Sequence, residues 1–200
     1  MIETLMFLLA YLLGSIPSGV WIGKLIFKTD IREHGSGNTG TTNTYRVLGK
    51  TAGTIVLVMD ILKGTIAALL PLFLGSNVHP MVVGLFAVIG HVFPIFAKFK
   101  GGKAVATSAG IALGAQPLFL LCIAAIWGAT LYVTSMVSLA SIIAVIIAAI
   151  ASLFLGDMLF AVIAWIAMII VIVRHSSNIV RIKNGTESKV PFGLKKNKSS

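Results

Sequence analysis

Charged residues are scarce in this sequence, and that scarcity excludes an ordinary water-soluble fold. Asp, Glu, Lys and Arg make up 11% of the 200 residues, hydrophobic residues make up 57%, and the mean hydropathy is +0.99. In soluble domains about a quarter of the residues are charged. We therefore expect an integral membrane protein, folded as a single domain over residues 1–200 because a bundle this small has room for one core.

Cysteine is nearly absent, since only Cys122 occurs and it lies inside an apolar run. No intramolecular disulfide and no cysteine-based metal cluster can form. H-E-x-x-H and other His/Cys zinc spacings are also missing, so we expect neither a metal nor a cofactor. No A-x-A-like cleavage site follows the first apolar run, which we therefore interpret as a retained transmembrane helix rather than a signal peptide.

The basic residues are clustered along the chain. All of the 16 except Lys63 fall into three groups, within residues 24–50, 98–103 and 174–198. Basic groups between apolar runs are the signature of loops on the cytoplasmic side of a membrane. A surface for nucleic acid is the alternative, but a nucleic-acid-binding domain would not be this hydrophobic, so we expect no such partner.

Apolar runs divide the chain into segments that can cross a bilayer, for which ~20 mostly apolar residues are needed. We predict spans at residues 5–26, 51–74, 80–97, 104–113, 117–133, 137–155 and 158–173. The apolar stretch from 104 to 133 is too long for one span. We split it between Gly114 and Pro117, because proline lacks the N–H that a helix interior needs.

The three basic groups determine the predicted topology. If all of them lie inside, an even number of crossings separates the second group from the third, and the breaks in the sequence favour four. The predicted fold is an all-α polytopic bundle of seven transmembrane helices, with its N-terminus outside and its C-terminus in the cytoplasm. We expect the tail, residues 189–200, to be disordered.

The first polar stretch reads G-S-G-N-T-G-T-T-N over residues 35–43, and Arg46 follows it. Glycines let backbone N–H groups approach a ligand closely, and Ser, Thr and Asn add side-chain donors. The guanidinium of Arg46 matches the geometry of a phosphate. A flexible polar loop is the alternative, but the ordered mixture of Asn, Thr and Arg favours an anion site.

The second polar stretch covers residues 90–107 and contains the sequence G-G-K, which ends at Lys103. A helix is predicted directly after this lysine, and its positive N-terminal end would face an anion held by the loop. The pattern is not that of a P-loop. Lys98 and Lys100 either contact the same ligand or only anchor the chain at the interface, and Lys103 is the stronger ligand candidate.

The third polar stretch, residues 174–181, lies at the inner end of the last predicted span. A helix that continues past Val173 would place His175 and Asn178 on one face. An interfacial helix end with anchoring arginines is an equally good interpretation of the stretch taken alone.

Two further polar groups lie in or beside predicted spans. Asp60 and Lys63 are three residues apart in the second span, and we interpret them as a buried ion pair, with a functional role as the second choice. Ser135, Ser138 and Ser141 lie near an inner helix end. Serines in membrane helices more often pack or bond to the backbone than act on a substrate.

The polar stretches are rich in hydrogen-bond donors and poor in bases. Their only carboxylates are Glu33 and Glu187, which lie at their edges. None of the four histidines belongs to a His-x-x-x-x-Asp pair, the acid–base dyad of common acyltransferases. This composition suits holding phosphates and stabilising an oxyanion more than general-base catalysis.

With these motifs in this order, the sequence resembles the bacterial acyl-phosphate:glycerol-3-phosphate acyltransferases. The motifs that carry the resemblance are S-I-P-S-G at residues 15–19 and the stretches 35–46, 90–103 and 174–187. They cover nearly the whole chain. Thr41 and Ala104 stand where Ala and Gly, respectively, are expected more often, and these mild departures put little in doubt.

The resemblance implies a seven-helix enzyme of the bacterial inner membrane whose active site faces the cytoplasm. It would transfer a fatty acyl group from acyl phosphate to the 1-hydroxyl of glycerol 3-phosphate, giving lysophosphatidic acid and phosphate, as the first acylation of phospholipid synthesis. No metal, coenzyme A or carrier protein is implied. Acyl phosphate is already activated, so no protein nucleophile is required, and Lys and Arg would offset the repulsion between two phosphates.

The same resemblance implies the site residues. The catalytic candidates are Ser36, Ser138, His175 and Asn178. The substrate-binding candidates are Arg46 and Lys103 for phosphate, together with Gly37, Asn38, Thr41, Thr42, Asn43, His91, Lys100, Gly101 and Gly102. His175 and Asn178 would orient the glycerol or stabilise the oxyanion, and a substrate phosphate would accept the hydroxyl proton.

Two other functions use the same features. A transporter for an organic phosphate would also need basic, donor-rich stretches, but transporters usually show inverted repeats and midplane sites, and the sequence indicates neither. A non-catalytic scaffold bound to anionic lipid accounts for the lysines but not for the order of Gly, Asn and Thr. Turnover by detergent-solubilised protein separates an enzyme from a transporter.

Overall fold

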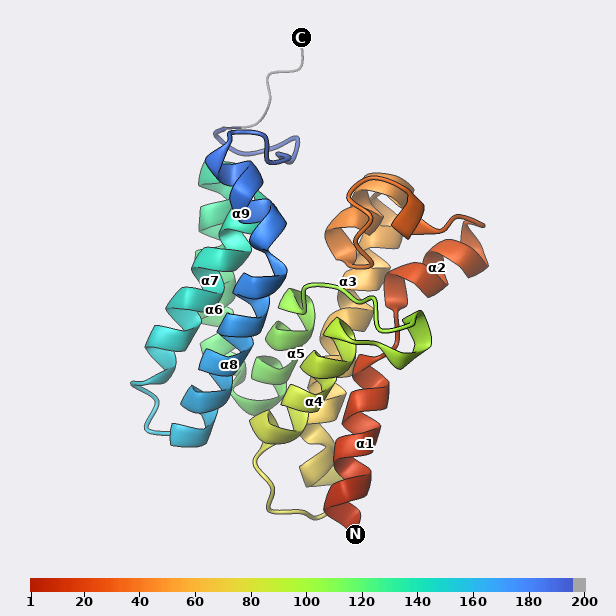
Figure 1. Ribbon diagram of the computed structural model, residues 1–200. Coiled ribbons are helices and arrows are strands. Elements are labelled where there is room, and N and C mark those ends of the chain that lie inside the picture. Colours follow the sequence, from red (N-terminus) through yellow and green to blue (C-terminus); the bar gives the residue numbers. More distant parts are fainter. Residues whose placement is uncertain (196–200) are drawn as a thin grey trace. The chain divides into compact units, whose positions relative to one another are not determined.

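The computed structural model describes residues 1–195, and within this range the chain is helical and contains no strand (Figure 1). Three helices are long and apolar enough to cross a membrane, or up to five if each of two bent helix pairs counts as one span. The predicted all-α class is therefore confirmed. Seven crossings and the orientation of the termini stay predictions.

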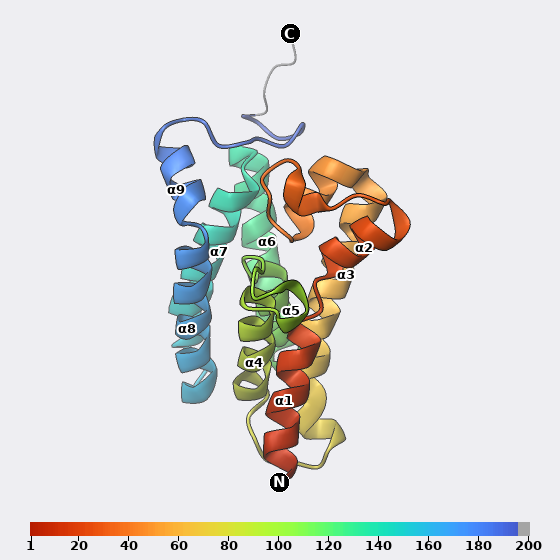
Figure 2. The same cartoon turned by 45° about the vertical axis from the view of Figure 1, so that its right-hand side comes forward.

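The chain divides into two compact units, Met1–Pro117 and Leu118–Ser200. A single domain over the whole chain thus stays a prediction. The first unit contains α1 (Ile2–Gly14), α2 (Ser18–Ile26), η1 (Ile31–Glu33), α3 (Thr41–Phe73), α4 (Pro80–Val92), η2 (Ile95–Ala97) and α5 (Val105–Ala115). In it α1, α4 and α5 pack against the long helix α3 (Figures 1 and 2).

Small residues let α3 and α5 approach each other closely. A Cβ atom added at Gly64 of α3 would meet the backbone of Thr107 on α5, and one added at Gly110 would meet the backbone of Ile61 on α3. Membrane helices pack by such close contacts, because lipid supplies no hydrophobic force between them. The contact fixes α5, and with it the loop that leads into α5.

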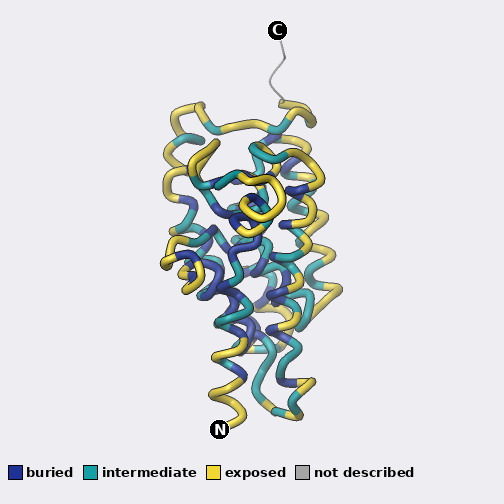
Figure 3. Tube along the Cα trace, turned by 90° about the vertical axis from the view of Figure 1, so that its right-hand side faces the viewer, coloured by how far each residue is buried: buried dark blue, intermediate teal, exposed yellow. Residues whose placement is uncertain are grey.

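The core of the first unit joins three of its helices. Met6 and Ala10 of α1 pack with Ala67 of α3 and with Val83 and Ala87 of α4, and all five are fully buried. The first residues of α1 are exposed (Figure 3). Large apolar side chains also remain exposed along α3 and α6, as expected of helices that face lipid.

The predicted first span is broken at Pro17. α1 ends at Gly14, α2 begins at Ser18, and the two helices are bent by 49° (Figure 2). Proline cannot donate the backbone hydrogen bond that a continuous helix needs at this position. The predicted span over residues 5–26 therefore consists of two helices.

The predicted polar loop over residues 27–49 ends earlier than expected, because α3 begins at Thr41. The helix is interrupted at Gly49, which has φ 85° and ψ −175°. Such a backbone conformation is accessible to glycine and strongly disfavoured for other residues. The prediction was wrong for residues 41–48, which form a short helical arm before the kink.

The second unit contains α6 (Pro117–Thr134, of which Pro117 belongs to the first unit), α7 (Val137–Ser152), α8 (Met158–Arg174) and α9 (Ser176–Lys183). The predicted separation of two helices just before Pro117 is confirmed. The rings of Phe119 on α6 and Phe160 on α8 pack edge to face at 5.2 Å. The Trp127 indole N–H of α6 donates to Ser141 of α7 at 3.2 Å.

The last predicted span does not continue straight past Val173. α8 and α9 are bent by 60° at His175, which closes one helix and precedes the next (Figure 1). The expectation of one continuous helix was therefore wrong. After α9 the chain returns to the α6–α7 turn, where Val190 N–H donates to Ser135 O and Leu194 N–H donates to Tyr132 O, each at 2.8 Å. The rest of the predicted tail, residues 196–200, lies outside the described residues.

Candidate active site

Asn43 organises the first polar stretch from inside. Its side-chain amide donates to Ile31 O at 2.7 Å and to His34 O at 3.1 Å, and its Oδ1 accepts from Ser36 N–H at 2.8 Å. Asn43 is 1% exposed. Buried amides that use their donors and acceptor in this way hold a loop in one conformation. The structure therefore gives Asn43, a predicted substrate ligand, the role of an internal brace.

Asn38 and Thr44 shape the start of α3. Asn38 Oδ1 accepts from Gly40 N–H at 2.9 Å, which is the turn geometry that Asn favours. Thr44 Oγ1 donates to Gly40 O at 3.2 Å and is buried. The Thr41 hydroxyl is buried and has no hydrogen-bond partner among the described residues. Asn38, like Asn43, thus supports the loop through contacts within it.

The outward-facing part of the stretch consists of other predicted site residues. Ser36, Gly37, Thr42 and Arg46 are exposed. Arg46 lies on the helical arm before Gly49, one turn and a half into α3. An exposed guanidinium beside exposed Ser and Thr hydroxyls offers charge and donors to a phosphate.

A cluster around Asp30 anchors the loop that precedes this stretch. Asp30 pairs with Arg32 at 2.6 Å and with Lys24 of α2 at 3.0 Å. The hydrogen bond from Arg32 lowers the pKa of Asp30 well below its usual range, against the opposing effect of burial. Arg32 and Lys24 therefore hold the loop, and Arg46 lies exposed on the helical arm that follows it.

The second polar stretch folds tightly onto the end of α4. Gly102 N–H donates to His91 O at 3.1 Å. A Cβ atom at Gly101 would collide with the backbone carbonyls of His91 and Val92, and one at Gly102 would collide with the imidazole of His91. Both glycines are thus required for packing. The loop then delivers Lys103 to the N-terminal side of α5.

Three residues in or next to this loop adopt left-handed backbone conformations, which turn the chain toward α5. Lys98, Phe99 and Ala104 have φ of 54°, 59° and 59°. Such values are uncommon for residues other than glycine, Asn and Asp. Ala104, which precedes α5, occupies the position where the sequence analysis expected glycine more often, and its φ supplies the physical reason.

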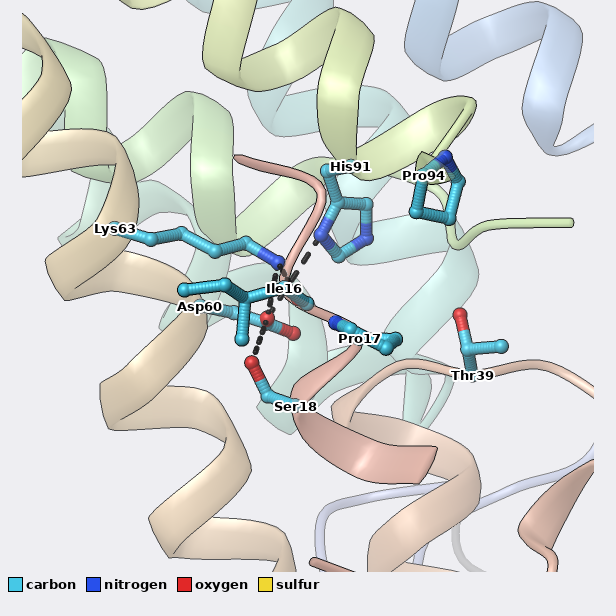
Figure 4. A pocket seen from close by; sticks show the side chains of 8 residues that line it. All are labelled: Ile16, Pro17, Ser18, Thr39, Asp60, Lys63, His91 and Pro94. Carbon is cyan, nitrogen blue, oxygen red and sulfur yellow. Dashed lines mark hydrogen bonds and ion pairs between the residues drawn. The ribbon is translucent and has the colours of Figure 1, made fainter. Parts of the chain in front are cut away.

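Four segments of the first unit meet in one small polar pocket (Figure 4). It is lined by Ile16, Pro17 and Ser18 from the α1–α2 break, Thr39 from the first polar stretch, Asp60 and Lys63 from α3, and His91 and Pro94 from the second stretch. Lys63 Nζ and Asp60 Oδ1 are 2.8 Å apart, which confirms the predicted buried ion pair. Ser18 Oγ donates to the same carboxylate oxygen at 2.9 Å.

The second unit gathers its polar residues around Glu187. Its Oε1 accepts from Ser138 Oγ at 2.9 Å and from Asn178 Nδ2 at 2.7 Å, and its Oε2 accepts from Arg181 Nε at 2.7 Å. Burial alone would raise the pKa of Glu187, but the bonds from Asn178, Arg181 and Ser138 outweigh it, so the pKa lies below its usual value. Glu187 is ionised at neutral pH and fixes residues from α7 and α9.

His175 lies at the bend between α8 and α9 and is 3% exposed. Its Nδ1 is 2.8 Å from Val171 O. A carbonyl can only accept, so this contact places a proton on Nδ1 and makes Nε2 the lone-pair nitrogen of the neutral ring.

The predicted site residues thus divide between the two units. Ser138, His175 and Asn178 belong to the second, and the others belong to the first. The sequence analysis placed Glu187 only at the edge of a motif and assigned no partner to Ser18. Ser18 lies 42 residues from Asp60, and Glu187 lies 49 residues from Ser138, so no local signal could have paired them.

No group of three or more His, Cys, Asp or Glu side chains that could hold a metal ion occurs in the described part of the chain. The polar positions carry Lys, Arg, Ser, Thr and amide donors instead, which recognise oxyanions. The fold and these positions define a polytopic helical membrane protein with basic, donor-rich loops.

Comparisons with known proteins identify the family. The family model of glycerol-3-phosphate acyltransferase matches residues 4–185. A glycerol-3-phosphate acyltransferase of Streptococcus thermophilus is 54% identical over 200 residues, which cover 95% of this chain and 94% of the relative. Its counterpart in Enterococcus faecalis is 55% identical, over 97% of this chain and 94% of the relative. The chain belongs to the glycerol-3-phosphate acyltransferase family.

Solved structures agree with this assignment. The crystal structure of PlsY (YgiH), an integral membrane glycerol 3-phosphate acyltransferase, in its glycerol 3-phosphate form has a TM-score of 0.89 and 37% identity, with 94% of each chain covered. The lysophosphatidic acid form has a TM-score of 0.85 at 37% identity, with 93% of this chain and 94% of that chain covered. The predicted family and the integral membrane character are thereby confirmed.

Proposed function

We propose that this protein transfers a fatty acyl group from acyl phosphate to the 1-hydroxyl of glycerol 3-phosphate and releases lysophosphatidic acid and phosphate. The observation that carries the proposal is the composition of the exposed polar positions. Ser36, Thr42 and Arg46 offer donors and positive charge, and no carboxylate base lies among them. A site with hydrogen-bond donors and no general base suits an acyl-group donor that is already activated.

The reaction balances without a covalent enzyme intermediate. The 1-hydroxyl oxygen attacks the acyl carbonyl carbon, the bond from that carbon to the bridging phosphate oxygen breaks, and phosphate leaves. A phosphate oxygen of one substrate takes the hydroxyl proton. What the protein supplies is the alignment of two anionic substrates and the neutralisation of their charge.

The first unit supplies the phosphate-binding groups in this proposal. Arg46 and Lys103 bind phosphate, and Ser36, Gly37 and Thr42 add donors from the exposed side of the loop. Five other predicted ligands of this unit act from behind these groups. Asn38 and Asn43 brace the first loop, and His91, Gly101 and Gly102 pack the second loop.

The predicted catalytic residues of the second unit are held in place by contacts within that unit. Asn178 and Ser138 are held by Glu187, which preorganises their positions. The tautomer of His175 makes its Nε2 the nitrogen that accepts a hydrogen bond from the substrate hydroxyl. Preorganised donors stabilise charge at no cost of reorientation during the reaction.

We also propose the setting of this activity. The chain crosses the bacterial inner membrane seven times, its N-terminus lies outside, and its site faces the cytoplasm, where glycerol 3-phosphate is found. Support comes from the basic residues, which flank the polar loops of the predicted inner face. The acyl chain lies among the helices, and no metal, coenzyme A or carrier protein takes part.

The decisive experiment measures phosphate release from palmitoyl phosphate by purified protein in detergent, with and without glycerol 3-phosphate. We expect release that requires glycerol 3-phosphate, yields lysophosphatidic acid, and is lost in Arg46→Ala. Lys50→Ala is the matched control, because Lys50 is exposed just beyond the Gly49 kink and carries no proposed role. Its activity should equal that of the wild type.

Palmitoyl coenzyme A and a palmitoyl carrier protein are tested in parallel as donors. Transfer from either of them at a rate equal to that from palmitoyl phosphate would contradict the proposed donor. If folded protein makes no lysophosphatidic acid from any of the three donors in any detergent or lipid, the acyltransferase reaction is wrong. Uptake of glycerol 3-phosphate into sealed vesicles would then establish a transporter.

A further inference from the structure

The ion pair of α3, Asp60 and Lys63, forms hydrogen bonds with residues at the break between α1 and α2. Lys63 Nζ donates to Ile16 O at 2.9 Å, and Ile16 lies in the break. Asp60 accepts from the hydroxyl of Ser18, the first residue of α2, at 2.9 Å. Figure 4 shows Lys63 and Ser18 both meeting the carboxylate of Asp60. Each charge thus touches a different one of the two helix ends.

The sign of each charge matches the helix end that it touches. A helix has partial negative charge at its C-terminus and partial positive charge at its N-terminus. The ammonium of Lys63 lies at Ile16 O, two residues beyond the end of α1, and the carboxylate of Asp60 lies at the hydroxyl of Ser18, the first residue of α2. With the two charges exchanged, each helix end would face a charge of the same sign as its own partial charge.

Burial makes this pair expensive unless it has such partners. The side chains of Lys63 and Asp60 are 5% and 3% exposed. Removing two charges from water costs several kcal/mol per ion, which their mutual attraction only partly offsets. Ionisable residues inside membrane helices accordingly mark functional positions by default. A pair placed only to hold two helices could be replaced by apolar residues.

The same carboxylate reaches the second polar stretch through His91. Asp60 Oδ1 is 3.8 Å from His91 Nδ1 (Figure 4), and the same nitrogen is 3.1 Å from Thr107 Oγ1. The His91 carbonyl accepts from Gly102 N–H, and the His91 ring occupies the space beside Gly102. The position of the imidazole therefore determines where Gly102 lies, and Lys103 is the next residue.

We propose that Asp60 and Lys63 are positioning residues for acyl transfer, which hold the α1–α2 break, orient His91 and thereby place the loop that carries Lys103. The inference rests on the proposed function, in which Lys103 binds phosphate. The pair touches no substrate. It acts because two charges on one stiff helix hold together segments that are far apart in the sequence.

The first test uses Asp60→Asn and Lys63→Met in purified full-length protein, with palmitoyl phosphate and glycerol 3-phosphate. A displaced loop raises KM for a phosphate substrate, whereas partial unfolding lowers the apparent kcat at unchanged KM. We expect kcat/KM to fall by about a hundredfold, mainly through KM. Unchanged KM in both folded variants would overturn the proposal.

Two further variants separate positioning from general stabilisation. Thr65→Val removes another polar contact of α3, from Thr65 Oγ1 to Gly110 O at 3.0 Å, and should lower the melting temperature while KM stays at its wild-type value. The exchange Asp60→Lys with Lys63→Asp keeps an ion pair but reverses its direction. It should fail to restore KM, and restoration would show that the match to the helix ends is irrelevant.

Hydrogen exchange gives a readout that does not depend on turnover. Asp60→Asn should increase amide exchange at residues 98–104 and weaken the protection that glycerol 3-phosphate confers there, whereas Thr65→Val should not. This result would support positioning even if palmitoyl phosphate proved to be the wrong donor. Exchange at residues 98–104 that is equal in Asp60→Asn and the wild type would overturn the inference while leaving the proposed function intact.

Discussion

Each unit of the molecule is organised by one buried carboxylate, but the two carboxylates lie on different kinds of structure. Asp60 lies on the long helix α3, and its charge is balanced by Lys63 one turn further on. Glu187 lies on the segment after α9, and its partners come from α7 and α9. In both cases a carboxylate accepts several donors and so positions the residues that carry them.

The two units therefore differ in the kind of substitution that disturbs them. The first unit also depends on backbone-to-backbone contacts at glycines, so a small added group displaces a loop without unfolding the helices. The second unit depends on side chains that converge on Glu187. Loss of this carboxylate therefore releases the segment after α9 that carries it. We therefore expect substitution of the packed glycines in the first unit to affect kinetics with little loss of stability, and substitution of Glu187 in the second unit to lower stability as well as kcat.

The largest effect should follow from Gly101→Ala. The new methyl group would collide with the carbonyls of His91 and Val92, so the loop must move away from α4. We expect acyl transfer to fall by about a hundredfold, with little change in melting temperature. Gly128→Ala is the matched control, because its Cβ meets no atom within 4 Å. Equal activity of the two variants would remove the distinction between the units.

Glu187→Gln should have the next largest effect, and on stability rather than KM. The amide cannot replace the charged acceptor of Arg181, and the variant should lose about 2 kcal/mol of unfolding free energy. Thermal unfolding and limited proteolysis of residues 184–195 measure the loss. Glu33→Gln, which alters an exposed carboxylate, should leave both unchanged. A rise in KM at wild-type stability would contradict the comparison.

The contribution of Glu187 should also depend on pH. Its pKa is lowered in the folded protein, so its stabilisation is fully present above the ordinary pKa of 4.5 and is lost as pH falls through the lowered value. The difference in stability between the wild type and Glu187→Gln should therefore be constant near neutral pH and shrink under acid conditions. A difference that grows on acidification would have the wrong sign.

The smallest effect should come from Ala104→Gly, and it should be stabilising. Ala104 has φ 59°, a conformation that costs an L-residue energy and costs glycine little. We expect a gain of about 1 kcal/mol in thermal unfolding. The same substitution at Ala109, inside α5, should instead cost about 1 kcal/mol. A loss at both positions would show that the backbone at Ala104 is not strained.

Local signals in the sequence predicted much of the fold. Pro117 separated two helices, because the missing N–H acts on the residue itself. The break at Pro17 has the same cause, but the apolar run around it was predicted as one span. The start of α3 could not be predicted in this way. Gly49 resembles a helix boundary in the sequence, whereas the helix begins at Thr41 after a turn that Asn38 stabilises.

The site was predictable in composition but not in the role of each donor. Residues 35–43 were recognised as rich in hydrogen-bond donors, although 41–43 are helical, and nothing in the pattern shows that Asn43 points inward while Ser36 and Thr42 are exposed. The spacing of Asp60 and Lys63 predicted their ion pair, since both lie on one helix. Their contacts with Ser18 and His91 depend on tertiary packing, which no local pattern encodes.

The pairing of Asp60 with Lys63 has a consequence for biosynthesis. Each charge at the centre of a membrane helix opposes insertion by roughly 3 kcal/mol, and α3 leaves the ribosome before α4 and α5 exist to shield it. Because the partners lie 2.8 Å apart on the same helix, they neutralise each other without waiting for later segments. The break at Ile16 and Ser18, which both charges contact, has already been synthesised by then. The first three helices can therefore assemble in the bilayer while the rest of the chain is still being made.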